Sequence, residues 1–417
     1  MKKKLLLGSS ALVLALALIF TACAGQAESA RADVQPALPI ANVYFTSDLS
    51  AEGLLNLFKA AMASPSNPGA DLAAFSNVGI NIHGGEDSIP QRSFAIEPYL
   101  IAFLVNHVNG TLVETNVSYA LPPNPARRGR TTTAGHEAVM RYFFNLGTGA
   151  GQNNWNIAII DAAGYREIPV NVNRSRRLNR LYLGYDVLDF DFYINLNHFT
   201  GHRQAGFGAA LKNMSLGLAS GGIDLVGGRG KALIHSGGRT SLLPWNTQVV
   251  GESVPHPTGP FQEAIVEGAL AVQDYLESHN IRMLHITVLN NLSIDCDCVP
   301  VFQVQNTPDI NDIGIIASWD PVAVDQAAID LIWRRNGTHL RTNLFNPPGD
   351  TRWNVSTVNF PANPAAVPYA VARGARVEGQ EIELIERIEI NNGQWKLDWG
   401  QTIGLGSTIY SFIDITR

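Results

Sequence analysis

Short apolar runs rich in β-branched residues alternate along the middle of the chain with stretches in which apolar residues recur every three or four positions. The runs are typical of buried strands, and the stretches are typical of helices. The expected strands are 78–82, 112–115, 156–161, 190–196, 284–289 and 313–318, and the expected helices are 98–108, 133–144, 261–278 and 322–333. This alternation predicts an α/β fold in which helices cover a largely parallel or mixed sheet.

The pattern changes after Asn336. Residues 381–390 alternate between apolar and polar side chains, and the turn sequence Asn-Asn-Gly follows them at 391–393. Alternation followed by such a turn predicts a β-hairpin, to which 407–413 adds a further strand. We therefore expect a small β-rich appendix in the C-terminal part of the chain.

The first residues have the features of a secretory signal. Lysines at positions 2–4 precede a largely apolar run, 5–20, which is shorter than the roughly 20 residues of a membrane-spanning helix. The run ends in Phe-Thr-Ala-Cys at 20–23, which resembles a bacterial lipobox with phenylalanine where leucine is usual. We expect a lipid on Cys23. The alternative is ordinary cleavage that leaves Cys23 as a free thiol.

A lipid at this position would anchor the mature protein to a membrane of the bacterial cell envelope, facing the periplasm or the exterior. The expected segments are a signal peptide over 1–22, a tether over 23–39, an α/β domain over 40–374 and the β-rich appendix over 375–417. The tether is small, polar and aperiodic, which is typical of a flexible linker.

Composition limits the classes of function. Apolar residues make up 46% of the chain, which is typical of a globular protein with a sizeable core. Charged residues make up only 16%, and the net charge is −6, so we expect no nucleic-acid partner. Three cysteines cannot supply the four thiolates of a typical iron–sulfur cluster, and we expect none in this chain.

Two histidines directly follow the expected strand 190–196. Ligands bind in the loops at the carboxyl ends of parallel strands, so His198 and His202 are candidate catalytic residues. They are four positions apart, and on a helix they would share a face and could share a metal ion. Gly201 disfavours such a helix.

The next residues are rich in glycine and carry two lysine–histidine pairs. Gly206 and Gly208 allow close approach of the backbone, as an anion or a nucleotide phosphate requires. Lys212, Lys231 and His235 complete the set of candidates here, Lys231 as a further cofactor-binding residue. The alternative interpretation is a flexible glycine-rich surface loop.

A second constellation is the sequence Asp295-Cys296-Asp297-Cys298, shortly after the expected strand 284–289. Two thiolates flanked by carboxylates can chelate a divalent metal ion. Cysteines separated by one residue close a disulfide only with strain, which favours Cys296 and Cys298 as metal ligands. Two buried, inert cysteines beside a turn are the alternative.

Five further polar residues lie near ends of expected strands and helices. Asp320 precedes a proline, as a helix N-cap does, and capping explains it fully. Asp325 is either a supporting carboxylate of the site or a favourable partner of the helix dipole. His83, Glu86 and His136 are other candidates, and each of them taken singly is better explained by structure than by catalysis.

Several of these blocks occur in an order that resembles the family called domain of unknown function 362. The blocks are 81–86, 110–119, 199–220, 296–298 and 312–332, and the resemblance covers roughly 78–335. Many relatives carry a ferredoxin-like insert with two four-cysteine motifs, whereas 236–260 here contains no cysteine. The resemblance therefore implies a member of the family that lacks the insert and its clusters.

A more distant local similarity concerns mechanism. Residues 202–212 resemble the segment of nickel-pincer lactate racemases that carries a catalytic histidine and the cofactor-bearing lysine, and a later histidine of those enzymes ligates nickel. This resemblance implies that His202 is a general base, Lys212 a cofactor anchor and His235 a metal ligand.

Together these features predict a metal-dependent enzyme that moves a proton on a small polar metabolite, with a divalent metal ion as cofactor. The reaction would be isomerase- or racemase-like, or linked to a separate redox partner. The alternatives are a lipoprotein that captures a metal or small ligand without turnover, and motifs that only determine the fold. The enzyme hypothesis requires that the segments near positions 200, 235 and 297 meet around one site.

Overall fold

The computed structural model describes ten parts of the 417-residue chain. They are 40–84, 96–116, 133–148, 156–202, 204–221, 229–238, 259–294, 296, 310–335 and 384–416. All of them belong to one compact unit, Pro39–Arg417. The expected signal peptide and tether, with Cys23, lie outside the described residues. No helix among the described residues is long and apolar enough to cross a membrane.

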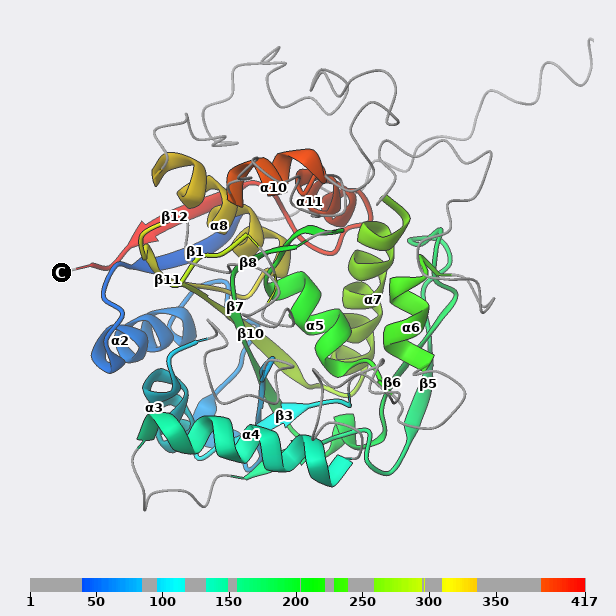
Figure 1. Ribbon diagram of the computed structural model, residues 1–417, viewed down its shortest axis with the longest axis horizontal. Coiled ribbons are helices and arrows are strands. Elements are labelled where there is room, and N and C mark those ends of the chain that lie inside the picture. Colours follow the sequence, from blue (N-terminus) through cyan, green and yellow to red (C-terminus); the bar gives the residue numbers. More distant parts are fainter. Residues whose placement is uncertain are drawn as a thin grey trace, which may run out of the picture. The chain divides into compact units, whose positions relative to one another are not determined.

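An eight-stranded mixed sheet forms the centre of this unit (Figure 1). In order across the sheet the strands are β12 (Tyr410–Asp414), β1 (Ala41–Thr46), β11 (Gly314–Ser318), β10 (Arg282–Leu289), β7 (Phe192–His198), β2 (Val78–Asn81), β3 (Thr111–Glu114) and β4 (Ile157–Ile159). The five strands from β10 to β4 are mutually parallel, and β11 is antiparallel to both of its neighbours. The carboxyl ends of those five strands therefore share one edge of the sheet.

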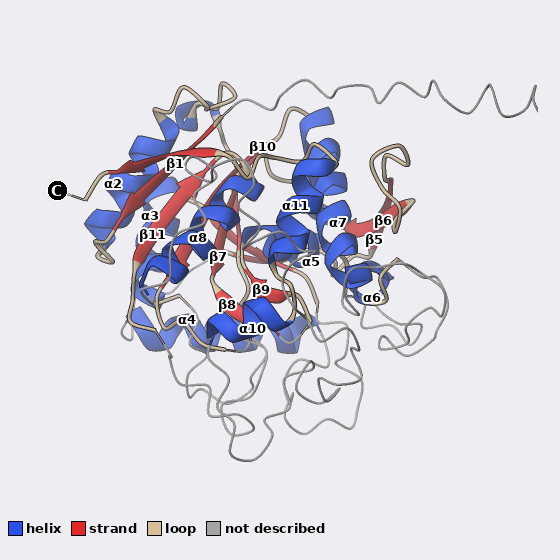
Figure 2. Cartoon of the chain, turned by 90° about the horizontal axis from the view of Figure 1, so that it is seen from above, coloured by secondary structure: helices blue, strands red, loops and turns tan. Residues whose placement is uncertain are grey.

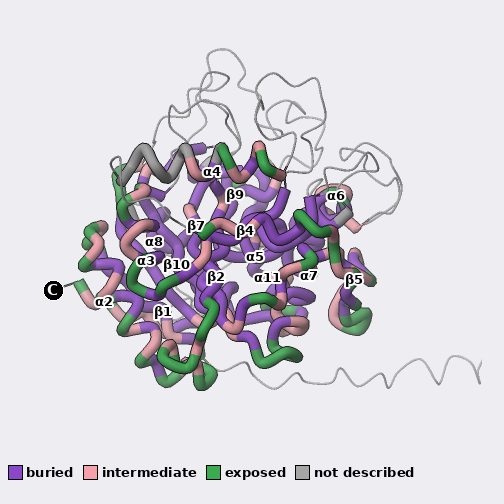
Figure 3. The backbone as a smooth tube through the Cα atoms, turned by 90° about the horizontal axis from the view of Figure 1, so that it is seen from below, coloured by how far each residue is buried: buried purple, intermediate pink, exposed green. Residues whose placement is uncertain are grey.

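Helices cover both faces of the sheet (Figure 2). One face packs against α2 (Ala51–Met62), α3 (Pro98–Val108) and α4 (Thr133–Thr148), and the other against α5 (Ala210–Leu218), α7 (Gly259–Ser278) and α8 (Pro321–Arg335). The helices α6 (Arg229–His235), α10 (Leu384–Ile390) and α11 (Gln394–Thr402) belong to the same core as this second group and pack outside the sheet. Side chains alternate between the faces along a strand, so Tyr193 of β7 joins one core while Ile194 joins the other. The central strands are buried throughout (Figure 3). The predicted α/β fold is confirmed.

Smaller elements complete the described chain. They are the hairpin β5 (Tyr165–Pro169) with β6 (Arg180–Gly184), the hairpin β8 (Thr200–His202) with β9 (Gly206–Gly208), and the short 3₁₀ helices η1 (Leu72–Ala74) and η3 (Tyr185–Leu188). Every strand and helix predicted between 78 and 333 is present, with ends that differ by a few residues. Apolar runs this short, between turns, identified the buried strands because both of their faces are covered.

The expected hairpin in the C-terminal appendix is wrong. Residues 384–390 and 394–402 form helices α10 and α11, and Asn392 turns the chain between them with a left-handed φ of 49°. Leu384, Ile385 and Ile388 have helical spacing and are all buried, so packing against the core decided between two patterns that the sequence allows. The strand expected at 407–413 is present as β12, which pairs in parallel with β1 at the edge of the main sheet (Figure 1).

Candidate functional site

The β8–β9 hairpin extends the central strand β7 beyond the carboxyl edge of the sheet. Its two arms are held together by the rings of Phe199 and Phe207, which stack with centroids 5.1 Å apart. The Gly201 N–H donates to the carbonyl oxygen of Ser293 at 2.8 Å. The segment that leads to Cys296 therefore runs directly beside the strand that ends in His202.

A side chain at Gly201 has no room, because a Cβ there would overlap the backbone carbonyl of Ile294. We expect Gly201→Ala to lower the free energy of unfolding by about 1–3 kcal/mol, since one of two backbone segments must move. Urea denaturation would measure it. An unchanged midpoint would show that the two segments are not in close contact in solution.

His202 is buried at the end of β8, and its hydrogen bonds define which ring nitrogen carries the proton. The backbone N–H groups of Gln204 and Ala205 donate to Nδ1, at 3.1 and 3.0 Å. In the neutral ring the proton is therefore on Nε2. Burial, and then the positive charges of Lys212 and Lys396, lower the pKa of His202 well below its usual value, so the ring is neutral.

His235, the last residue of α6, has the opposite tautomer. Its Nδ1 lies 2.7 Å from the carbonyl oxygen of Lys231 and must donate to it, which leaves the lone pair on Nε2. Burial lowers the pKa of His235 to about 4. Both imidazoles pack against Phe261 of α7, with centroid distances of 5.8 Å for His202 and 5.1 Å for His235. The segments near 200 and 235 thus meet, as the enzyme hypothesis requires.

Cationic side chains surround His202. Lys212 of α5, Lys396 of α11 and Arg387 of α10 each act to lower its pKa. Lys396 is fully buried, where its ammonium donates to the carbonyl oxygens of Ala205 and Phe207 and lies 3.3 Å from the centroid of the Phe207 ring. Sequence reasoning missed Lys396 and Arg387, because no motif near either one indicates a site.

Both candidate carboxylates of α8 cap helices. Asp320 accepts the N–H groups of Val322 and Ala323, as the capping interpretation predicts. Asp325 instead caps α5, by accepting the N–H groups of the first two residues of that helix at 2.8 and 3.1 Å. Burial raises the pKa of Asp325 and the charge of Lys396 opposes this rise, which leaves the pKa at about 6. Asp325 thus holds in place the helix that carries Lys212.

The remaining candidates of this region have local partners. His198 ends β7 with its Nε2 2.6 Å from the carbonyl oxygen of Asn290, so His198 and His202 lie on different strands rather than on one helix. Gly206 has a φ of 75°, and its Cα faces Gly393 closely. Gly208 faces the side chain of Lys212. Close approach at these two glycines serves contacts within the chain.

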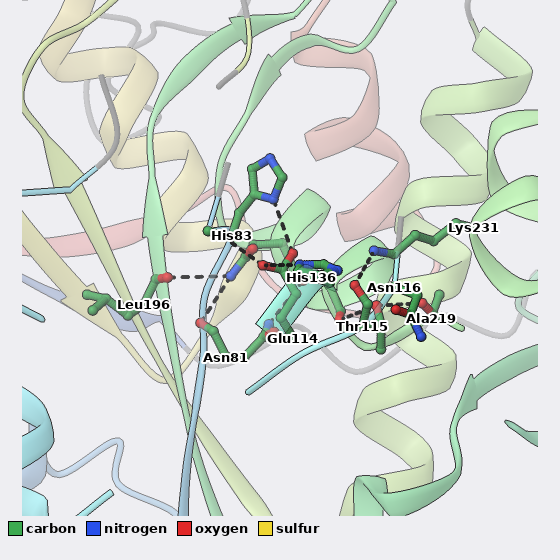
Figure 4. A network of polar contacts seen from close by, with 12 residues as sticks. Asn81, His83, Glu114, Thr115, Asn116, His136, Leu196, Ala219 and Lys231 are labelled. Carbon is green, nitrogen blue, oxygen red and sulfur yellow. Dashed lines mark hydrogen bonds and ion pairs between the residues drawn. The ribbon is translucent and has the colours of Figure 1, made fainter. Parts of the chain in front are cut away.

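A second group of polar side chains lies at the carboxyl ends of β2 and β3 (Figure 4). Glu114, the last residue of β3, has Oε1 3.3 Å from His83 Nδ1 and Oε2 3.6 Å from His136 Nε2. Beside it, Lys231 donates to the carbonyl oxygen of Thr115 at 3.2 Å. The structure thus brings together His83 and His136 around a carboxylate that sequence reasoning missed. Glu86 lies outside the described residues.

The prediction that Cys296 is a metal ligand requires a thiolate at this position. Cys296 is instead buried and disulfide-bonded, so its sulfur is not a thiolate here. Asp295, Asp297 and Cys298 lie outside the described residues. Within the described parts of the chain, no three histidine, cysteine or carboxylate side chains are placed to hold one metal ion.

Comparison with known proteins gives one family and several distant structures, of which two are described here. The model of a family described as "Domain of unknown function (DUF362)" matches residues 78–330. A crystal structure of a Thermotoga maritima protein matches at 13% identity and a TM-score of 0.37, over 69% of this chain and 58% of that one. The lactate racemase apoprotein from Thermoanaerobacterium thermosaccharolyticum matches at 12% identity and a TM-score of 0.31, over 59% of this chain and 50% of that one.

This chain therefore spans less than two thirds of the length of either structure. No protein with a curated description matches it.

Proposed function

The chain belongs to the DUF362 family, whose name assigns no reaction, and we propose from the geometry of its site that it is an enzyme that moves a proton on a small organic anion. One observation carries the proposal. His202 and His235, which are 33 positions apart in sequence, pack against the same Phe261 with complementary tautomers. One neutral ring can donate a hydrogen bond while the other accepts a proton.

The hydrogen bonds of the two rings favour His235 as the proton acceptor and His202 as the hydrogen-bond donor. These roles are the reverse of those implied by the racemase resemblance. His235 Nε2 has the lone pair and would accept the proton from the substrate. His202 Nε2 has the hydrogen and would donate to the substrate oxygen on which negative charge develops. Two backbone N–H groups occupy Nδ1 of His202, which prevents the tautomer that a base at Nε2 requires.

The surrounding charges support an anionic substrate. Lys212, Lys396 and Arg387 place positive charge around His202, which attracts a carboxylate and also stabilises the negative charge that forms when a proton leaves. Burial strengthens these interactions because the local dielectric constant is low. Burial and the nearby positive charges keep both imidazoles neutral, which is the state that a pair of proton-transferring rings requires.

The proton transfer proposed here is carried by the two imidazoles, and a divalent metal ion would be a separate cofactor of the site. The described residues do not make a complete metal site, although His235 donates its Nδ1–H to a carbonyl as metal-bound histidines do. Metal analysis of the purified protein, and an assay before and after a chelator, would decide whether a divalent ion takes part.

The proposed location is the bacterial cell envelope, with the protein anchored through a lipid on Cys23. The charged start, the apolar run and the lipobox-like sequence at 1–23 support this. Mass spectrometry of the membrane fraction would detect the lipid on the N-terminal cysteine, and a Cys23→Ser variant is expected to leave that fraction.

Exchange of substrate hydrogen with solvent tests the proposed chemistry. We expect the protein to catalyse the exchange of carbon-bound hydrogen for deuterium in D₂O. The probes are small 2-oxo and 2-hydroxy carboxylates such as pyruvate and glycolate, and the exchanging carbon is the one next to the carbonyl or hydroxyl group. Loss of the ¹H NMR signal of that carbon measures the exchange. The control is His107→Gln, which changes an exposed histidine of α3. Ligand-dependent thermal stabilisation without any exchange would contradict the enzyme and favour capture.

A further inference from the structure

The Glu114 group is chemically distinct from the site around His202. Burial by itself raises the pKa of Glu114, but the two imidazoles beside it outweigh burial and hold the pKa well below its usual value. The Gly84 N–H also donates to Oε2, at 2.8 Å. Glu114 is therefore a buried carboxylate anion, whereas cations surround His202.

This carboxylate determines the state of His83. Because Oε1 of an ionised carboxylate can only accept, the Nδ1 of His83 carries the hydrogen that points to it. The lone pair of the neutral ring is then on Nε2. That atom is buried and has no hydrogen-bond partner among the described residues, although about a quarter of the side chain is exposed (28%). Unpaired buried polar atoms are costly, so Nε2 of His83 calls for a partner that the described residues do not supply.

We propose that His83 is a second proton-accepting group of this protein, with Glu114 as its positioning residue, and that it binds a small molecule that presents an ammonium or hydroxyl group. The inference does not rest on the proposed function. The ligand N–H or O–H donates to His83 Nε2. In a full transfer the bond from that hydrogen to the ligand breaks, an Nε2–H bond forms, and the ligand keeps the electron pair.

The charge balance favours such a ligand. Before transfer the His83–Glu114 pair carries one negative charge, and after transfer the imidazolium and the carboxylate sum to zero. A cationic or neutral donor therefore gains from the carboxylate, and an anion does not. The site around His202, with its surrounding cations, has the reverse preference, so one probe of each charge can distinguish the two sites.

The experiment uses the full chain with ¹⁵N-labelled histidine rings and the probes ethanolamine, a cation with N–H and O–H donors, and glycolate, an anion. His83→Gln identifies the resonances of His83 by difference, and His107→Gln serves as the matched exposed control. We expect Nδ1–H with an unprotonated Nε2 at His83, and a shift of that Nε2 resonance on addition of ethanolamine. His235 should not respond to ethanolamine.

Glu114→Gln tests the positioning role. Glutamine keeps an acceptor oxygen but loses the charge, so the tautomer should persist while ethanolamine binds about tenfold more weakly. A protonated Nε2 at His83 in the wild type, or no response of His83 to ethanolamine, overturns the inference. A response of His235 to glycolate alone would leave the proposed function standing and this inference refuted.

Discussion

Lys396→Met is expected to lower the free energy of unfolding by about 3 kcal/mol, a large effect for a residue far from every sequence motif. The substitution leaves the buried Asp325 without its cation, and it leaves the carbonyl oxygens of Ala205 and Phe207 without a donor. Methionine fills the space with a side chain of similar length, so the loss is mainly that of the hydrogen bonds that the Lys396 nitrogen donates. Urea denaturation at pH 8 measures it.

Lys59→Met is the matched control, because Lys59 is exposed on α2 and its loss should change the free energy of unfolding by less than about 0.5 kcal/mol. If both variants were equally stable, the Lys396 ammonium would contribute nothing to the packing of α11 on the β8–β9 hairpin. The interpretation of the C-terminal helices as part of the site would then be wrong.

Lys396 also makes the free energy of unfolding depend on pH. Burial, opposed by the charge of Asp325, lowers the pKa of Lys396 to about 7. The unfolded chain, with a lysine pKa of about 10.4, therefore binds more protons than the folded chain between these values. We expect the contribution of Lys396 to make the wild type more stable as pH rises from about 7 to 10. The difference in unfolding free energy between wild type and Lys396→Met, followed across that range, isolates it.

The sequence predicted the central sheet because buried strands leave a strong pattern. Runs such as 284–289 and 313–318 are short, rich in apolar residues and buried on both faces, and few other structures suit so short a segment. It also predicted that the segments near 200 and 235 would meet, and the histidines of both segments pack against Phe261. Residue 297 itself lies outside the described residues. The segment just before Cys296 lies beside β8, where the Gly201 N–H donates to the Ser293 carbonyl oxygen.

What the sequence could not predict depends on contacts between distant segments. Helices α10 and α11 follow a pattern that also suits strands, and only the core that they cover selects the helix. In the sequence, Glu114 is an ordinary polar residue at the end of a strand. Its place in the site depends on His136, which folding brings close from helix α4. Tautomers are equally invisible in a sequence, because the groups that set them are backbone atoms brought close by folding.

His235→Gln is expected to lower the rate of hydrogen exchange on the active probe by about 10²–10⁴-fold, since glutamine has no basic nitrogen. His202→Gln should cost less, because the glutamine amide can still donate a hydrogen bond to the substrate oxygen. Deuterium incorporation measured by ¹H NMR at equal protein concentrations gives both rates. The opposite order of effects would assign the base to His202, as the racemase resemblance implies.

The pH profile separates a base from a residue that only holds the fold. With the pKa of His235 lowered to about 4, the ring is unprotonated and competent over the whole neutral range. The contribution of His235 to the exchange rate should therefore be level above about pH 5 and fall below it, as His235 becomes protonated. If His235 had a purely structural role, the exchange rate would fall only at the pH at which the protein unfolds. A fall in rate between pH 5 and 4, in protein that circular dichroism shows to be folded, identifies His235 as the base when the residual rate of His235→Gln does not fall with it.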